Sequence, residues 1–324
     1  MASTSLSQSG NTPVLNLEPA EILAGPHLTP AQLAWRRFLK HQMAVAGMIG
    51  VIALFVFIVA GSFVISEDYA NRNDLKARLA PPSAGHWFGT DSTGRDSFAR
   101  VIYGGQISLF VGFTSVILAV SLGTLVGGVA AYFGGWIDNI LMRFTEAMLS
   151  IPQLFLLIVL GKFLGNDIPT IHVFGREFSG SVGIVIIVIG ITSWMYLARI
   201  VRANVLSLKE LDYISAAKAL GVSDTRIFFN HLIPNTIAPL IVSATLGLAG
   251  AIITEAYVSF LGLGVQPPTA TWGNMMQAAI SFIQRGAWWM WFFPSIFIVI
   301  TVLFINFMGD GLRDALDPRT RKQL

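Results

Sequence analysis

The chain has 324 residues, of which 54% are hydrophobic and only 12% are charged, whereas about a quarter of the residues of an ordinary soluble domain are charged. This composition indicates an integral membrane protein. The net charge of +3 comes from 21 basic and 18 acidic residues spread along the chain, with no dense basic block, so nucleic acid is excluded as a partner. The absence of cysteine excludes disulfides, thiolate metal sites and cysteine nucleophiles.

The first segment of the chain, residues 1–34, is predicted to be a flexible tail. It is rich in Ser, Pro and small residues, and it lacks the basic start and the apolar core of a signal peptide. We expect the first membrane helix to hold this tail in place.

Six stretches are long and apolar enough to cross a bilayer, because about 20 residues of helix span a hydrocarbon core of roughly 30 Å. They are residues 44–65, 107–133, 144–164, 182–201, 237–261 and 288–308. The first contains no charged residue. The third contains Glu146, Pro152 and Lys162, and we expect a kinked span there, since neighbouring helices can satisfy the carbonyl that a proline leaves free.

The orientation follows from the basic residues. Six spans place both termini on one side, and more than half of the 21 Lys and Arg residues fall in the segments that are cytoplasmic if the N-terminus is inside. The loop of residues 202–236 is then cytoplasmic as well. The expected organisation is a tail of residues 1–34, a first span with an external loop and interfacial helix in 35–106, a transmembrane core in 107–308 and a cytoplasmic tail in 309–324.

Two spans are rich in glycine. The stretches "SLGTLVGGVAAYFGG" in the second span and "ATLGLAGAI" in the fifth are typical of helices that pack closely through small residues. We expect packing at both places rather than ligand binding.

The cytoplasmic loop contains a predicted helical hairpin, "YISAAKALGVSDTRIFFNHLIPN" at residues 213–235. Gly221 is the residue type that takes the left-handed conformation after a helix. Ser223 fits an N-cap, so the second helix is expected from Asp224 to about Leu232, and Pro234 ends it or begins the next span.

One face of the first hairpin helix is thin. Helical spacing puts Ile214, Ala217 and either Leu220 or Gly221 on the same side. The small side chains of Ala216 and Ala217 leave the helix narrow there. Such a helix is suited to packing on the chain's own spans, which periodicity favours slightly, and also to insertion into a groove of another protein.

The segment from Ser215 to Pro234 resembles the Glu-Ala-Ala loop of bacterial ABC importer permeases. The residues that match its pattern are Ala216, Ala217, Gly221, Ile233 and Pro234, whereas Ser215 stands where that family usually has Glu. The stretches "HWFGTDSTGRDSFARVIYGGQISL", "SFLGLGVQPPTATWG" and "NFMGDGLRDALDPR" narrow the resemblance to the C-type permease of dipeptide and oligopeptide transporters. The likeness runs from about residue 35 to the C-terminus.

The resemblance implies an all-α protein of the bacterial inner membrane, with six transmembrane helices, the type I ABC importer permease fold and cytoplasmic coupling helices. It implies a heterodimer with a homologous permease, two cytoplasmic ABC ATPases, an external solute-binding protein and a peptide substrate; nickel chelates or other small solutes are the alternative. The residues implied in coupling to the ATPase are Ser215, Ala216, Ala217, Gly221, Asp224, Ile233 and Pro234. ATP and Mg²⁺ would bind the ATPases and not this chain, which lacks a G-x-x-x-x-G-K-[ST] loop and is expected not to be an enzyme.

Two acidic residues lie within predicted spans, where an ionisable side chain is costly and by default indicates function. Glu146 follows Arg143 by three residues, and we expect an ion pair on one helix face in preference to a substrate contact. Glu255 is expected either to line the pathway and meet the amino terminus of a peptide or to bond a neighbouring helix, and the sequence leaves both open.

Three tryptophans stand at the outer start of the last span. Trp288, Trp289 and Trp291 are expected at the membrane interface, where the amphipathic indole ring is favoured. Stacking on a cofactor is not needed to explain them.

In the external loop, Asp91, Arg95 and Asp96 are expected to pair and to cap an interfacial helix, with a docking surface for the binding protein as the alternative.

Two other classes of function are compatible with the acidic residues in the spans. One is a self-sufficient transporter or channel that uses Glu146 and Glu255 as proton relays, and the other is an intramembrane hydrolase that uses the same acids. The hairpin and the missing nucleotide motif favour the ABC permease.

Overall fold

The computed structural model describes residues 29–164, 171–173 and 176–317. Its α-helices are α1 (Pro30–Lys40), α2 (Gln42–Val64), α3 (Glu67–Asn71), α4 (Ser97–Phe133), α5 (Gly135–Ser150), α6 (Gln153–Leu164), α7 (Gly180–Lys209), α8 (Asp212–Ala219), α9 (Asp224–Ile227), α10 (Ile233–Phe260), α11 (Trp272–Ala279) and α12 (Trp289–Leu316). Two 3₁₀-helices, η1 (Leu75–Ala77) and η3 (Ile280–Arg285), and a π-helical turn, η2 (Phe228–Leu232), complete the helical part. Between α6 and α7, β1 (Ile171–Val173) pairs antiparallel with β2 (Arg176–Phe178), with His172 opposite Glu177.

Five helices of the described chain are long and apolar enough to cross a membrane. They are α2, α4, α7, the continuous helix Asp224–Phe260 and α12. α5 and the first part of α6 meet at an angle of 88°. If these two helices are counted together as one broken span, the described residues contain six spans. The predicted kink is a break in the structure. Ile151, just before Pro152, is extended, since a residue that precedes proline is disfavoured in the α conformation.

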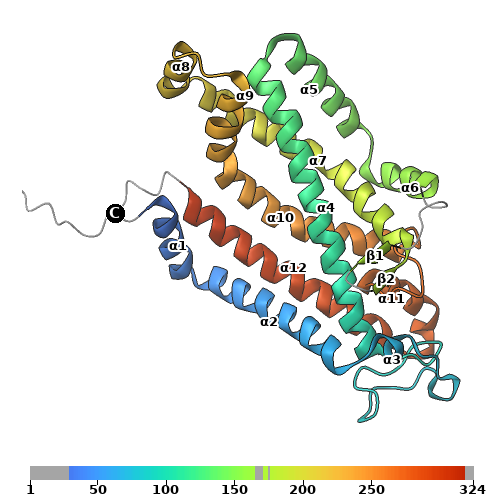
Figure 1. Ribbon diagram of the computed structural model, residues 1–324. Helices are drawn as coiled ribbons and strands as arrows, with labels where there is room; N and C mark the ends of the chain where they lie inside the picture. Colours follow the sequence, from blue (N-terminus) through green and yellow to red (C-terminus); the bar gives the residue numbers. More distant parts are fainter. Residues whose placement is uncertain (1–28, 165–170, 174–175, 318–324) are drawn as a thin grey trace, which may run out of the picture.

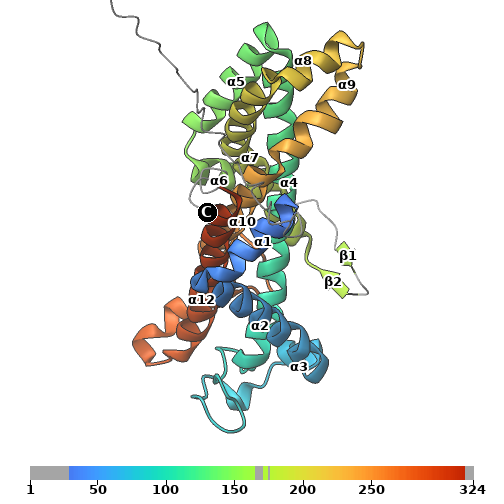
Figure 2. The same ribbon diagram turned by 90° about the vertical axis from the view of Figure 1, so that its left-hand side faces the viewer.

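The helices form a bundle around α4 and α10. α4 packs along α7, α10 packs against α4, α7 and α12, and α2 packs against α12 and α4. Figures 1 and 2 show α5, α8 and α9 together at one end of the molecule, called here the hairpin end, and α3 at the opposite end, called here the loop end.

The glycines of α4 allow a close contact with α7. A Cβ at Gly127 would lie 2.1 Å from the Ala198 carbonyl oxygen of α7, and one at Gly123 would lie 2.7 Å from Leu197 Cβ. The predicted packing is confirmed there. In α10 the alanines of the predicted stretch, Ala249 and Ala251, are buried. The glycines are not closely packed, because a Cβ at Gly247 would find one atom, 3.9 Å away, and a Cβ at Gly250 would find none within 4 Å.

Two predicted segments differ in the structure. Residues 30–34, assigned above to the tail, belong to α1, which begins at a capping box of Thr29 and Gln32 with Pro30 at its first position. The separate interfacial helix is absent from the described residues, since Asp96 caps a single helix that runs on to Phe133. Residues 1–28 of the N-terminal tail and 318–324 of the C-terminal tail lie outside the described residues.

Candidate functional site

The hairpin of α8 and α9 turns at Gly221. This glycine has φ +77°, and the Val222 and Gly221 amides donate to the Ala217 and Lys218 carbonyls at 3.1 and 3.0 Å. These two bonds form a Schellman motif, which needs a residue in the left-handed conformation at this position. The predicted corner at Gly221 is confirmed.

Of the two predictions made for Pro234, the structure has the second, in which the proline begins the next span. α9, η2 and α10 are continuous from Asp224 to Phe260, and Pro234 lies in the first turn of α10. Ser223 occupies the N-cap position but makes no side-chain capping bond. The Ile233 amide donates to the Phe228 carbonyl, so a wider π-helical turn joins α9 to α10 just before the proline. The second half of the hairpin and the membrane span α10 are therefore parts of one continuous helix.

The two faces of α8 have different surroundings. Ile214 is fully buried, and Ala217 packs with it against the cluster that contains Trp194 of α7 and Phe228 of η2. On the other face Ser215 and Ala216 are exposed, and Leu220 is 85% exposed at the corner. The hairpin thus packs on its own chain and still presents a free surface with an apolar tip.

Polar contacts attach the hairpin to the end of α4. The Tyr132 hydroxyl donates to an oxygen of Asp224, and the Lys218 ammonium lies 5.4 Å from the centre of the Tyr132 ring. The Phe228 ring lies 6.1 Å from that of Tyr132 and covers Gly128, where a Cβ would come within 2.7 Å of it. Sequence reasoning missed Tyr132, because no local pattern joins residues 92 positions apart.

Removal of the Tyr132 hydroxyl should loosen the hairpin. We expect Tyr132→Phe to raise amide hydrogen exchange in α8 and α9 about fivefold, since a partly exposed hydrogen bond contributes about 1 kcal/mol. Tyr213→Phe is the matched control, because among the described residues the Tyr213 hydroxyl accepts only a long, weak bond of 3.5 Å from Asn235 Nδ2. Equal exchange in the two variants would show that the bond to Asp224 does not hold the hairpin.

A cavity of about 360 Å³ lies between α4, α6, α7 and α10. Its wall combines aliphatic side chains with uncharged polar groups, and no charged residue lines it. The polar groups come from Ser115, Gln153, Ser193, Tyr196, Ser243 and Thr254. Such a wall can form hydrogen bonds with a solute without binding it through a fixed charge.

The glycines of α10 form part of this cavity wall. Ser243, Gly247, Gly250 and Thr254 share one face of α10 and all line the cavity. Tyr196 of α7 is also in the wall, and it is 69% exposed. The sequence did contain a signal, since small and hydroxyl residues recur at a helical spacing in an apolar span.

Glu255 does not line this cavity. It is fully buried, and its two oxygens accept bonds from the hydroxyls of Ser108 in α4 and Ser259 in α10, both at 2.8 Å. The Ser108 hydroxyl in turn accepts a bond from the Trp272 amide at the start of α11, at 3.3 Å. Of the two roles left open, these contacts fit the bond to neighbouring helices.

Glu146 forms the expected ion pair. Arg143 Nη1 lies 3.1 Å from Glu146 Oε2, and both side chains are exposed. The pair belongs to a second pocket between α5 and α7, where Arg202 holds Asp138 with two bonds of 2.6 Å. Glu255 is not among the residues that line this second pocket.

At the loop end, Asp91 organises the segment before α4. Its carboxylate accepts bonds from the Thr93 and Arg95 amides at 2.8 and 3.0 Å and from Arg95 Nε at 2.6 Å. Burial alone would raise the pKa of Asp91, but Arg95, Arg100 and the amide bonds together hold that pKa below its ordinary value. The expected pairing is confirmed in this loop.

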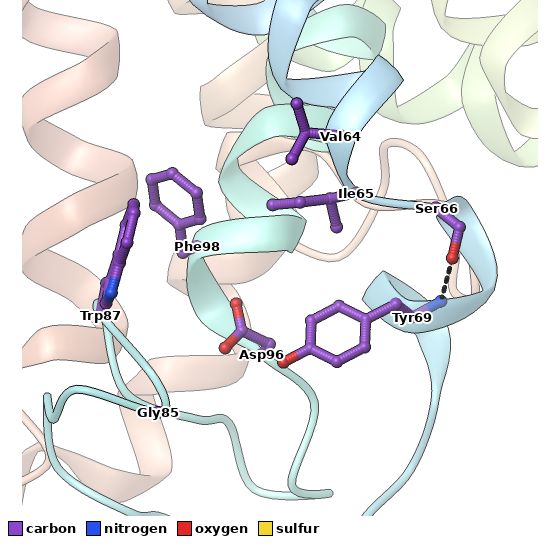
Figure 3. A pocket seen from close by; sticks show the side chains of 8 residues that line it. All are labelled: Val64, Ile65, Ser66, Tyr69, Gly85, Trp87, Asp96 and Phe98. Atoms are coloured by element: carbon purple, nitrogen blue, oxygen red, sulfur yellow. Dashed lines mark hydrogen bonds between the residues drawn. The ribbon is translucent and has the colours of Figure 1, made fainter.

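An open pocket of about 500 Å³ lies beside this loop (Figure 3). Tyr69, Trp87 and Phe98 form its aromatic part, and Trp87 is 63% exposed. Figure 3 shows the Tyr69 hydroxyl directed toward Asp96, and burial together with this carboxylate raises the pKa of Tyr69. Asp96 also accepts the Ala99 amide at 2.8 Å as the cap of α4 and lies 2.8 Å from His86 Nδ1.

Within the described residues, no group of three His, Asp or Glu side chains is placed to hold a metal ion. The charged groups singled out above are instead paired with each other or with hydroxyl and amide groups.

Two family models match the chain. Residues 106–322 match the binding-protein-dependent transport system inner membrane component, and residues 29–82 match the N-terminal transmembrane domain of oligopeptide transport permease C. Among solved structures, the chain is similar to the inward-facing MetNI methionine ABC transporter, with a TM-score of 0.50 and 21% identity over 68% of this chain and 97% of that one. This likeness is one of fold, and it confirms the fold that the resemblance implied.

The chain is also similar to curated proteins over nearly its whole length. It is 42% identical to the dipeptide transport system permease protein DppC of Bacillus subtilis (strain 168), over 95% of this chain and 93% of that protein. It is 37% identical to the oligopeptide transport system permease protein OppC of the same strain, over 95% of each chain.

Proposed function

Because this chain belongs to the family of binding-protein-dependent transport system inner membrane components, we propose that it forms half of the translocation pathway of an ATP-driven peptide importer. The observation that carries the proposal is the continuous helix from Asp224 to Phe260, which joins an exposed hairpin to the wall of a polar, uncharged cavity. The names of the relatives support dipeptides or oligopeptides as the substrate class.

The proposal needs partners that this chain does not supply. A homologous permease would complete the pathway, and two ABC ATPases would bind ATP and Mg²⁺ on the cytoplasmic side, where the distribution of basic residues predicts the hairpin and both termini. The exposed face of α8, with Leu220 at its tip, supports docking into a groove of an ATPase, because a large apolar side chain exposed on a polar hairpin is typical of a contact surface.

Coupling would follow two routes from the hairpin. One runs along α9 into α10, whose first turn contains Ile233 and Pro234 and whose later turns line the cavity. The other runs through the Asp224 contact with Tyr132 into α4, which packs closely on α7 at Gly127. Closure of the two ATPases would thus move three helices of the cavity wall and alternate access to it.

The loop end would face the external solute-binding protein. The pocket of Tyr69, Trp87 and Phe98 supports this, because exposed aromatic side chains around a recess are typical of binding hot spots. The ion pair between Asp91 and Arg95 would stabilise the conformation of the loop that carries this surface.

Uptake of a labelled dipeptide into proteoliposomes tests the proposal. We expect uptake only when the co-purified permease and ATPase subunits, the binding protein and ATP are all present. Uptake by this chain in the absence of the ATPases, driven by a proton gradient, would contradict it and would favour the secondary transporter that uses Glu146 and Glu255.

A further inference from the structure

The pocket between α5 and α7 has no part in the coupling routes above. It has a volume of about 370 Å³ and is lined by Arg143, Arg199 and Arg202 together with Asp138 and Glu146. Three guanidinium groups therefore face two carboxylates, and the pocket has an excess of one positive charge.

The excess charge belongs to Arg199. Arg202 and Asp138 satisfy each other through two bonds of 2.6 Å, and Arg143 makes a single contact of 3.1 Å with Glu146. Arg199 is exposed, and among the described residues it has no hydrogen-bond or ion-pair partner. A planar guanidinium with free donors is suited to a phosphate oxygen, which it can bind through two parallel bonds.

The surroundings of the pocket favour a membrane lipid over a soluble anion. Trp136, Ile140 and Phe144 follow one another at a spacing of four along α5, one of the two helices that form the pocket, and are 72%, 58% and 55% exposed. Both views place α5 at the edge of the molecule (Figures 1 and 2). A helix that carries both an exposed apolar stripe and residues of a basic pocket matches a lipid, whose acyl chains are apolar and whose headgroup is charged.

We infer that this pocket binds the phosphate of an anionic membrane phospholipid, with Arg199 as its main contact and the stripe from Trp136 to Phe144 along its acyl chains. Basic pockets between membrane helices on the cytoplasmic side are suited to anionic headgroups. The inference does not depend on peptide transport, although the proposed orientation places the pocket in the cytoplasmic leaflet.

Native mass spectrometry of the full-length chain, purified with the subunits that accompany it, tests this inference. We expect phosphatidylglycerol to stay bound to the wild type and phosphatidylcholine to be lost. Arg199→Gln should weaken phosphatidylglycerol binding about fivefold, the effect of one basic residue at a membrane surface, and Arg199→Lys should keep most of it. Arg313→Gln is the matched control, since Arg313 is an exposed arginine of α12 that is absent from the pocket lining.

Three results would overturn the inference. Equal lipid retention by Arg199→Gln and Arg313→Gln would remove Arg199 from the site. Displacement of phosphatidylglycerol by millimolar inorganic phosphate would make the pocket a site for soluble anions. Loss of the accompanying permease subunit from Arg199→Gln, with lipid retention unchanged, would make the pocket a protein interface.

Discussion

Gly221→Val is expected to abolish ATP-driven transport while leaving the membrane spans folded. The left-handed conformation at Gly221, with φ +77°, costs about 1–2 kcal/mol for an ordinary residue and more for a β-branched one. A Cβ there would find no atom within 4 Å, so the damage comes from backbone conformation and not from crowding. A cost of about 2 kcal/mol shifts the equilibrium between the native turn at residue 221 and other turn conformations roughly 30-fold.

A series of variants separates this cause from others. Gly221→Asn should keep much of the transport, because Asn tolerates the left-handed region, and Ser215→Ala should be close to wild type, since the Ser215 side chain is exposed. The measurements are dipeptide uptake and ATP hydrolysis in the same proteoliposomes. If Gly221→Val and Ser215→Ala were equally active, the corner at Gly221 would have no role in coupling.

Glu255→Ala is expected to destabilise the chain, whereas Glu255→Gln should remain folded and active. The alanine variant leaves the Ser108 and Ser259 hydroxyls without their acceptor in a fully buried site, which costs about 2–4 kcal/mol. The thermal midpoint should then fall by roughly 4–10 °C. The glutamine variant keeps the shape and one acceptor oxygen, so its loss of stability should be smaller.

These two variants also distinguish the classes of function. A proton relay needs a group that can gain and lose a proton, and the side-chain amide that Glu255→Gln introduces could not act as one. Thermal unfolding and ATP-driven uptake should be measured on both variants. A well-folded Glu255→Gln protein with no transport would contradict the structural role and favour proton coupling.

Local features were predictable from the sequence because their causes are local. A glycine after a run of helix formers predicted the turn at Gly221, and the stretch around Gly127 predicted a close helix contact. Asp91 and Arg95 are four residues apart, so their pairing could be inferred as well.

Features that depend on distant neighbours were not predictable. A proline in an apolar segment permits either a kink or a break, and the outcome depends on the surrounding helices. The 88° bend at Pro152 therefore could not be predicted from the sequence. Trp289 was expected at the membrane interface, but it is buried and donates to the Thr90 carbonyl at 3.0 Å. Gly247 and Gly250 were assigned to packing, since composition does not show whether a small residue faces a helix or a cavity.

Site-directed crosslinking from the hairpin tests the central claim most directly. The chain has no cysteine, so Leu220→Cys adds a single thiol at the exposed tip and Trp87→Cys adds one at the opposite end. In the intact complex we predict that Leu220→Cys crosslinks to an ATPase subunit and that Trp87→Cys crosslinks only to the external binding protein. Failure of Leu220→Cys to reach the ATPase, or an ATPase crosslink from Trp87→Cys, would contradict the proposed docking and orientation.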